Sequence, residues 1–511
     1  MNQLKAGAVL SFLSIFVNVI IALLYTPILI RLLGQSEYGL YSLIGSIAGY
    51  LSIMDLGLGN AIVRYTARNR ALGDKVIESK LNGMFLLLYT VIGLLTVVVG
   101  AVIFNSIDQI FGASLSTSEL QKAKIMILVL IVNFALSFPL SVFGSIMQAY
   151  EKFIAVKIVT LIRYIMLPIL SLPFLYVGYG SVSIVIITTI INISCLLFTV
   201  FYCFKHLKIR FFFSKIDYRM LVEIIGYSFF IFLNVIVDQI YWNTDQFVLG
   251  IISGTATVAI YAVAMQFIKL YMMFSTSVSG VFLPKVSMMV ANNSSNYELT
   301  NLTIKVGRVQ YIIMALIVSG FVLFGRPFIN LWAGSNFDDA YYIVLLVMIP
   351  LTIPLIQNVC ISILQAKNLH GFRSIIMIVV AVIKVIISIP LAKYYSGVGA
   401  AIATMVPLIV GNIIIMNVYY QKKIGLNMLL FWRNILIISI PVLISLLFGY
   451  GIIYLLPDNS LLHLLYKILL FTIIYIVLIW LLGLNKYEKQ LIKSVIIKVT
   501  NTFNKMKSVN S

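Results

Sequence analysis

Runs of about 20 apolar residues recur along the whole chain, separated by short polar connections. A run of that length crosses the hydrocarbon core of a bilayer as an α-helix, because a helix satisfies its own backbone hydrogen bonds. The pattern predicts an all-α polytopic membrane protein with about fourteen spans and no sizeable soluble domain. We place these spans at 8–30, 39–63, 83–104, 125–148, 158–177, 180–203, 221–250, 259–283, 309–329, 341–365, 374–392, 397–420, 434–456 and 464–484.

Composition supports this interpretation. The chain has 511 residues, of which 61% are hydrophobic and 10% are charged. An ordinary soluble domain has about 25% charged residues. The first apolar run is longer than a signal-peptide core and no A-x-A site follows it, so we expect an uncleaved first span.

The net charge is +20, and the Lys and Arg residues are distributed unevenly between the connections that join the spans. One alternating set of connections, with the two termini, holds 27 Lys and Arg residues; the other set holds four, namely Arg31, Lys122, Lys124 and Lys393. The positive-inside rule then places both termini in the cytoplasm. This asymmetry accounts for the charge without a nucleic-acid partner.

The chain contains an internal duplication. The Gly-to-Tyr spacing of Gly34–Tyr41 recurs at Gly254–Tyr261, and Gln148-Ala149 and Gly178 each have a counterpart 217 to 219 residues further on. A repeat of six spans preserves orientation, so it predicts two parallel six-helix bundles. Paired repeats around a central site are a common plan of transporters.

The predicted organisation has five parts. The basic, amphipathic tail is expected to lie along the inner membrane surface, or else to be solvated and partly helical. The parts are an N-terminal bundle at 1–203, a cytoplasmic linker at 204–220, a C-terminal bundle at 221–420, two additional helices at 434–484 and the tail at 485–511.

The seventh span carries a polar stripe. Asn234, Asp238, Tyr241 and Asp245 are spaced by 4, 3 and 4 residues, which puts them on one helical face. The equivalent positions of the first span include Asn18 and Tyr25. Such a stripe faces either a water-filled cavity or another helix.

Three cations lie within spans, where an uncompensated charge costs about 2.5–3.5 kcal/mol or more. They are Lys269, Lys384 and Arg163. Each side chain either recognises an anion in a central cavity or forms an internal ion pair, for example Lys269 with Asp238 or Asp245. Arg31 and Arg64 lie at span ends, where snorkelling is the alternative to an anion contact.

Asp55 begins the segment Asp-Leu-Gly-Leu-Gly-Asn-Ala, whose two glycines allow close approach of helices. Its carboxylate either binds a proton or cation, or caps a neighbouring helix. The three histidines and three cysteines are scattered, without ligand spacing. We therefore expect no catalytic residue, no metal site and no enzymatic activity.

The segment Gly34-x-x-Glu37-Tyr38-Gly39-Leu40-Tyr41, with Asp55 to Tyr65, resembles the start of bacterial Wzx-type polysaccharide flippases. These belong to the multidrug/oligosaccharidyl-lipid/polysaccharide exporter superfamily. The resemblance implies a multi-pass protein of the bacterial cytoplasmic membrane that flips an undecaprenyl-diphosphate-linked oligosaccharide by alternating access, for O-antigen or capsule assembly.

On chemistry and position, five cations are candidates to contact the diphosphate or sugar: Lys269, Arg31, Arg64, Arg163 and Lys384. Asp55, Asp238 and Asp245 are candidate coupling sites for protons, sodium or the membrane potential, and no cofactor is expected. The expected partners are the lipid-linked oligosaccharide, membrane lipids, and the polysaccharide polymerase with its chain-length machinery.

Several alternatives stay open. A cation-coupled multidrug exporter of the same superfamily would favour acidic residues in its cavity. A flippase for the peptidoglycan precursor is a closer variant. A membrane-embedded polymerase or glycosyltransferase would need a large outer loop or a catalytic constellation, and a scaffold of an assembly complex would leave the intramembrane charges unexplained.

Overall fold

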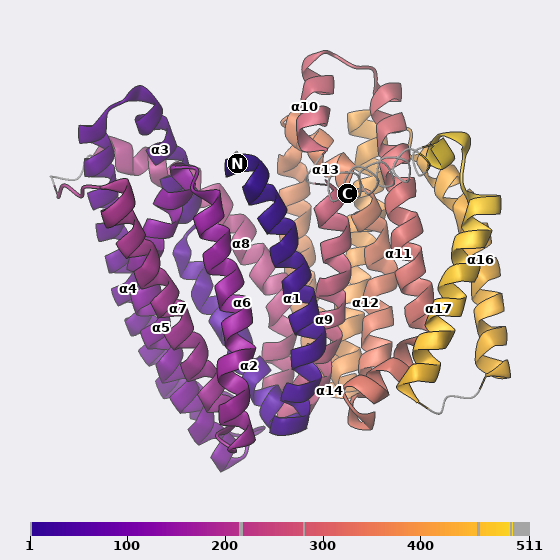
Figure 1. The fold of residues 1–511 in the computed structure, drawn as a ribbon, viewed down its shortest axis with the longest axis horizontal. Helices are drawn as coiled ribbons and strands as arrows, with labels where there is room; N and C mark the ends of the chain where they lie inside the picture. The colour runs from indigo at the N-terminus through magenta and orange to yellow at the C-terminus, as the bar shows by residue number, and fades with distance from the viewer. Residues whose placement is uncertain (1–2, 214–217, 280–281, 457–459, 491–492, 494–511) are drawn as a thin grey trace, which may run out of the picture. The chain divides into compact units, whose positions relative to one another are not determined.

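The computed structural model describes residues 3–213, 218–279, 282–456, 460–490 and 493. Within these ranges the chain is helical and has no strand (Figure 1). Thirteen of the described helices are long and apolar enough to cross a membrane. The all-α polytopic fold predicted from the sequence is confirmed.

The helices follow the predicted spans closely. Their bounds are α1 Gln3–Leu33, α2 Gln35–Ser52, α3 Leu58–Leu72, α4 Lys75–Phe111, α5 Thr117–Ala149, α6 Phe153–Tyr176, α7 Gly180–Tyr202, α8 Tyr218–Ile252, α9 Gly254–Ser279, α10 Leu283–Ala291, α11 Asn296–Trp332, α12 Asp339–Ile356, α13 Asn358–Ala366, α14 His370–Pro407, α15 Met416–Tyr419, α16 Met428–Leu455 and α17 Leu461–Leu478. After a break at Ser396, π-helical turns continue the second part of α14 through α15 to Ile424.

The predicted spans at 374–392 and 397–420 are two helices that meet at Ser396, where the backbone is not helical (φ 50°, ψ −131°). A Cβ on Gly399 would lie 2.0 Å from the Leu391 carbonyl oxygen, so the chain folds back on itself there. Because these two helices carry the single label α14, thirteen long helices account for fourteen predicted crossings. The span at 39–63 is broken between α2 and α3, because Leu56 and Gly57 adopt left-handed backbone angles.

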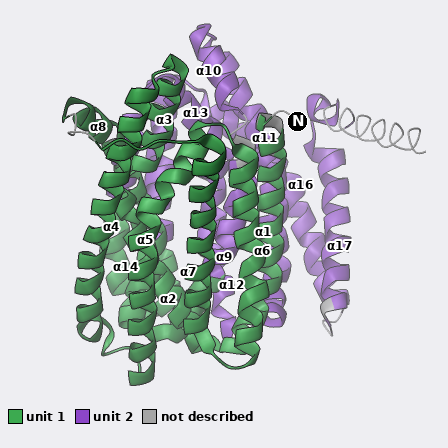
Figure 2. Cartoon of the chain, turned by 60° about the vertical axis from the view of Figure 1, so that its left-hand side comes forward, with its two compact units in different colours: residues 1–263, 381–403 green, residues 264–380, 404–511 purple. Residues whose placement is uncertain are grey.

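The chain divides into two compact units (Figure 2). Unit 1 contains residues 1–263 and 381–403, and unit 2 contains residues 264–380 and 404–511. The predicted boundaries at 203 and 221 therefore differ from those of the compact units. The physical reason is that α8 packs on α2 and α3, and that the middle of α14 carries a charge paired with α8.

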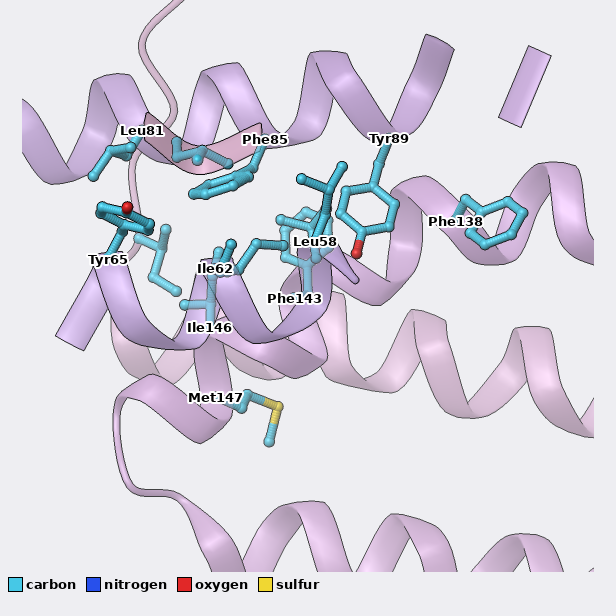
Figure 3. Packing of buried hydrophobic residues seen from close by; sticks show 14 of the residues in the cluster. Leu58, Ile62, Tyr65, Leu81, Phe85, Tyr89, Phe138, Phe143, Ile146 and Met147 are labelled. Carbon is cyan, nitrogen blue, oxygen red and sulfur yellow. The ribbon is translucent and has the colours of Figure 1, made fainter. Parts of the chain in front are cut away.

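The core of unit 1 brings α3 together with α4 and α5 (Figure 3). Ile62, Phe85 and Ile146 are fully buried there, one from each helix. Tyr89 adds a polar contact, since its hydroxyl donates to Asp55 Oδ1 over 2.7 Å. Apolar packing thus fixes α3 after the break at Asp55, and the tyrosine satisfies the carboxylate at that break.

In unit 2 a buried ion pair anchors the two additional helices α16 and α17, which appear in yellow beside α11 in Figure 1. Arg308 of α11 donates from Nε to Glu488 Oε1 over 2.6 Å and from Nη2 to Glu488 Oε2 over 2.9 Å. The same guanidinium reaches the carbonyls of Gly483 and Asn434. The start of the predicted tail is therefore packed into unit 2, while 491–492 and 494–511 lie outside the described residues.

Gly39, a residue of the N-terminal motif, lies where α2 meets the start of α9. A Cβ atom at this position would come within 1.8 Å of the Thr255 carbonyl oxygen and 3.2 Å of the Ala259 nitrogen. Both neighbours are backbone atoms, so no side-chain rotation relieves the clash. Glycine is therefore required at position 39 for the helices to touch.

We expect Gly39→Ala to lower the midpoint of thermal unfolding of the detergent-purified protein by several degrees. Gly45→Ala is the matched control on the same helix, because no atom lies within 4 Å of its added Cβ. Alanine favours a helix over glycine by about 1 kcal/mol, so the control should be unchanged or slightly more stable. Equal stability of the two variants would contradict the close contact.

Candidate functional site

The polar stripe of α8 divides into an exposed part and a buried part. Asn234 and Asp238 are exposed, whereas Tyr241 and Asp245, one and two turns further along, are buried. The sequence left open whether the stripe lines a cavity or bonds to another helix. In unit 1 its buried half bonds to neighbouring helices.

Lys384 of α14 and Asp245 of α8 form an ion pair inside unit 1. Lys384 Nζ lies 2.9 Å from Asp245 Oδ2, and each side chain is only 1% exposed. The same ammonium donates to the Tyr241 carbonyl oxygen and lies 4.5 Å from the centroid of the Tyr241 ring. A buried charge is stable only when it is paired and its remaining hydrogen-bonding capacity is satisfied.

The carboxylate of Asp245 has further donors. Ser388, one turn after Lys384, donates from Oγ to Asp245 Oδ1 over 3.0 Å, and the Tyr261 hydroxyl donates to Oδ2. Next to it, the Tyr50 hydroxyl and Thr244 Oγ1 lie 2.7 Å apart. Helices α8, α9 and α14 thus meet in one hydrogen-bonded network within unit 1, and α2 is hydrogen-bonded to α8 at the neighbouring residue.

This network changes the interpretation of two predicted residues. Lys384 was a candidate to bind the diphosphate or sugar, and Asp245 a candidate to couple transport to an ion. In the structure each neutralises the other, as expected for the internal ion pair that the sequence analysis kept as the alternative. The sequence analysis named Asp245 as a possible ion-pair partner of Lys269. In the structure, Asp245 is paired with Lys384 instead.

Lys269 lies on α9, in the part that belongs to unit 2, and its side chain is exposed. Among the described residues, its ammonium forms no hydrogen bond or ion pair. An ammonium in the middle of a membrane-length helix must reach water or an anion, because hydrocarbon offers no hydrogen bonds in place of those that the ammonium makes with water. Lys269 therefore keeps its predicted role as a candidate contact for an anion.

The other predicted cations lie on three different helices of unit 1. Arg64 of α3 is exposed, with its guanidinium 4.4 Å from the centroid of the Tyr227 ring of α8. Arg31 is exposed at the end of α1. Arg163 of α6 is half-buried, and its Nε has no hydrogen-bond partner among the described residues. Contact of these side chains with substrate stays a prediction.

In α1 the polar positions contribute to helix packing. Tyr25 is buried, and its hydroxyl lies 2.7 Å from Ser171 Oγ of α6. Asn18 is half-buried. For Tyr25 the structure favours the helix–helix alternative over cavity lining.

The Asp55 segment behaves as its glycines predict. Gly57 has φ 72°, and a Cβ there would lie 2.9 Å from the Ile231 Cβ, so it lets α8 approach the break between α2 and α3. Asp55 itself is half-buried, and its carboxylate accepts a hydrogen bond from the Tyr89 hydroxyl. It does not cap a helix in the described hydrogen bonds, and its proposed ion coupling stays a prediction.

Sequence reasoning missed the role of Glu37 in the N-terminal motif. Its carboxylate lies 3.0 Å from Lys122 Nζ and accepts the Ser181 backbone N–H over 2.9 Å and the Ser181 hydroxyl over 3.0 Å. It thereby ties the α1–α2 turn to the beginnings of α5 and α7. Its place in the motif was the available signal, because an acid in the first turn of a helix is otherwise explained by the helix dipole alone.

In the described part of the chain, no three His, Cys, Asp or Glu side chains come close enough to hold a metal ion.

Comparison with known proteins supplies the family context. The family described as "Polysaccharide biosynthesis protein" matches residues 4–290. A relative from Bacillus subtilis (strain 168), the "Uncharacterized membrane protein EpsK", is 21% identical over 446 residues, which are 82% of this chain and 83% of the relative.

Solved structures show the same fold. The chain is similar to "Lipid II flippase MurJ, inward closed conformation" with a TM-score of 0.72 and 20% identity, over 93% of this chain and 97% of that one. It is also similar to an inward-facing multidrug resistance MATE family transporter of the MOP superfamily, with a TM-score of 0.55 and 18% identity, over 76% of this chain and 96% of that one. The family match confirms the resemblance to polysaccharide flippases stated from the sequence, and the solved structures confirm the fold.

The ion pair makes a quantitative prediction. Lys384→Met or Asp245→Asn alone leaves one partner uncompensated in the interior, at a cost of about 3–5 kcal/mol. We expect each single variant to lower the thermal unfolding midpoint strongly, and the double variant to lose much less than the sum.

The measurement is a double-mutant cycle by thermal unfolding in detergent, with Lys393→Met as control. Lys393 is exposed on the same helix, so its loss should have little effect. Strictly additive losses would show that the two charges do not interact.

Proposed function

Because the chain belongs to the polysaccharide biosynthesis protein family, we propose that it flips an oligosaccharide linked to undecaprenyl diphosphate across the bacterial cytoplasmic membrane by alternating access. The lipid tail stays in hydrocarbon, while the sugars and the diphosphate need a polar route. Moving such a head through lipid unaided is prohibitive, because its polar groups would lose their hydrogen bonds to water. The product would serve assembly of a surface polysaccharide such as O-antigen or capsule.

One observation carries the proposal: polar side chains stay exposed on membrane-length helices. Lys269 on α9 is the clearest case, and Asn234 and Asp238 on α8 are two more. An ammonium suits a diphosphate, and amide and carboxylate groups suit sugar hydroxyls. A protein that only scaffolds other membrane proteins would have no use for an exposed cation at this depth.

The solved neighbours support movement of a lipid-linked substrate. A flippase named for lipid II shares the fold over 93% of this chain, against 76% for the MATE transporter. A peptidoglycan precursor flippase is thus a close variant of the proposal. Both readings involve a diphosphate-linked sugar.

A cation-coupled multidrug exporter is the second candidate, favoured by the exposed carboxylate of Asp238. A cationic drug would be repelled by Lys269, which is why we place this candidate second. Asp238 instead fits the proposed coupling to a proton or sodium ion.

The positive-inside distribution supports cytoplasmic termini, and a flippase of this kind would deliver its cargo to a polymerase and its chain-length machinery on the outer face.

The decisive experiment is deletion of the gene in its native host, followed by extraction of the polyprenyl-diphosphate lipids and assignment of the sugar-linked form to a leaflet. We expect the complete oligosaccharide-lipid to accumulate on the cytoplasmic face, with loss of surface polysaccharide. Accumulation of unpolymerised units on the outer face would instead identify a step after translocation. Unchanged lipids would overturn the proposal and lead to tests of cation-dependent drug efflux.

We expect Lys269→Gln to reduce surface polysaccharide by about tenfold or more at an equal amount of membrane protein. A charge-assisted hydrogen bond contributes about 1.5–3 kcal/mol, and 1.4 kcal/mol corresponds to tenfold. Complementation of the deletion strain measures the effect, with Lys393→Gln as an exposed-lysine control. Normal polysaccharide in a stably expressed Lys269→Gln strain would remove this residue from the substrate path.

A further inference from the structure

A pocket lies within unit 1, at the end where α3 finishes and α4 and α8 begin. Its volume is about 600 Å³, and Arg68, Lys80 and Arg219 line it together with Glu223. Tyr65 and Leu81, seen together at one edge of the core cluster in Figure 3, form part of its wall. None of its lining residues belongs to the network around Lys384 and Asp245.

The wall of this pocket is held by backbone contacts. The Phe212 N–H donates to the Ser79 carbonyl oxygen over 3.0 Å. Gly83 allows the approach, because a Cβ there would lie 2.5 Å from the Phe212 carbonyl oxygen. Phe212 is thereby fixed against the first turns of α4, and the neighbouring Phe213 lines the cavity.

Among its described lining residues, the pocket carries a surplus of positive charge. The one acid among them, Glu223, lies 3.8 Å from Arg68 Nη1 and accepts a hydrogen bond from the Tyr65 hydroxyl over 3.2 Å. Lys80 is exposed and forms no hydrogen bond or ion pair with the described residues. Three cations against one carboxylate make an environment that attracts an anion, and an Arg fork suits the oxygens of a phosphate group.

Below the charges, the pocket becomes apolar. Met84, Leu87 and Met220 line it, and Leu87 is followed on the same face of α4 by Val91 and Leu94, all three exposed. These residues are spaced by 4 and 3, so they form one continuous apolar stripe along the membrane-length helix. A charged site at the end of such a stripe fits a molecule with an anionic head and a hydrocarbon tail.

We propose that this pocket binds the phosphate-bearing head group of a membrane amphiphile, with Arg68, Lys80 and Arg219 around the phosphate and the tail along α4. The site is separate from the polar face of α8 and does not depend on the identity of the transported molecule. Two kinds of ligand have this chemistry: an anionic phospholipid of the membrane, and a polyprenyl diphosphate.

The test is native mass spectrometry of the full-length protein, delipidated in neutral detergent and titrated with phosphatidylglycerol or phosphatidylcholine. We expect one tightly retained phosphatidylglycerol and no such site for phosphatidylcholine. Arg68→Gln/Lys80→Gln/Arg219→Gln should weaken that site by about tenfold or more. Lys75→Gln/Lys205→Gln/Lys208→Gln removes the same charge from the same end outside the pocket and should leave the site intact.

Two single variants still test the proposal if the triple variant folds poorly. Lys80→Gln leaves no described partner unpaired and should weaken binding. Glu223→Gln removes the only acid of the pocket and should strengthen binding, a change of sign that general destabilisation would not produce. Equal phosphatidylglycerol binding by wild type, Lys80→Gln and Glu223→Gln would overturn the proposal.

Competition separates the two sources. If geranylgeranyl diphosphate displaces phosphatidylglycerol from wild type at lower concentration than phosphatidylglycerol itself requires, the pocket prefers diphosphate amphiphiles. If it fails to compete, the pocket is a phospholipid site. If both triple variants, in the pocket and outside it, lose the preference for phosphatidylglycerol, the basic end of the protein attracts anions in general. That result would contradict the proposal.

Discussion

The pairing of Lys384 with Asp245 is the interaction on which the organisation of unit 1 depends. Neither charge is tolerable alone among apolar helices, so each requires the other within hydrogen-bond distance. The pair joins the middle of α14 to α8, and the hydroxyls of Ser388 and Tyr261 complete the carboxylate's hydrogen bonds. Residues 381–403 therefore belong to unit 1, although the neighbouring parts of the same helical stretch belong to unit 2.

The same constraint sorts the remaining intramembrane charges into two groups. Arg308 and Glu488 repeat the buried arrangement in unit 2, where they fasten α16 and α17 to α11. Lys269 and Asp238 stay exposed on membrane-length helices, and the exposed ammonium of Lys269 supports the proposed polar path for a diphosphate-linked sugar. Buried pairs thus hold the helices together, while Lys269 forms no ion pair among the described residues.

Much of the fold followed from sequence, because apolar runs of membrane length have one stable solution in lipid. The close helix approach at Gly57 and the separation of the spans at 374–392 and 397–420 were also predicted. The break between α2 and α3 inside the span at 39–63 was not predicted, and neither was the packing of Glu37 on Lys122 and Ser181. The sequence identified Lys384 and Asp245 as charged residues within spans, but their pairing joins residues far apart in the chain and depends on tertiary packing.

The separation of buried from exposed charges can be measured directly by thiol accessibility. Cys195, Cys203 and Cys360 are buried and can be replaced to give a cysteine-free background. In that background, Lys269→Cys and Lys384→Cys are treated with a charged methanethiosulfonate reagent in inverted and right-side-out vesicles. We predict rapid modification at position 269, slowed by the lipid-linked oligosaccharide, and no modification at position 384. Equal modification at the two positions, or protection at 384 alone, would contradict the assignment of Lys384 to packing and Lys269 to the substrate path.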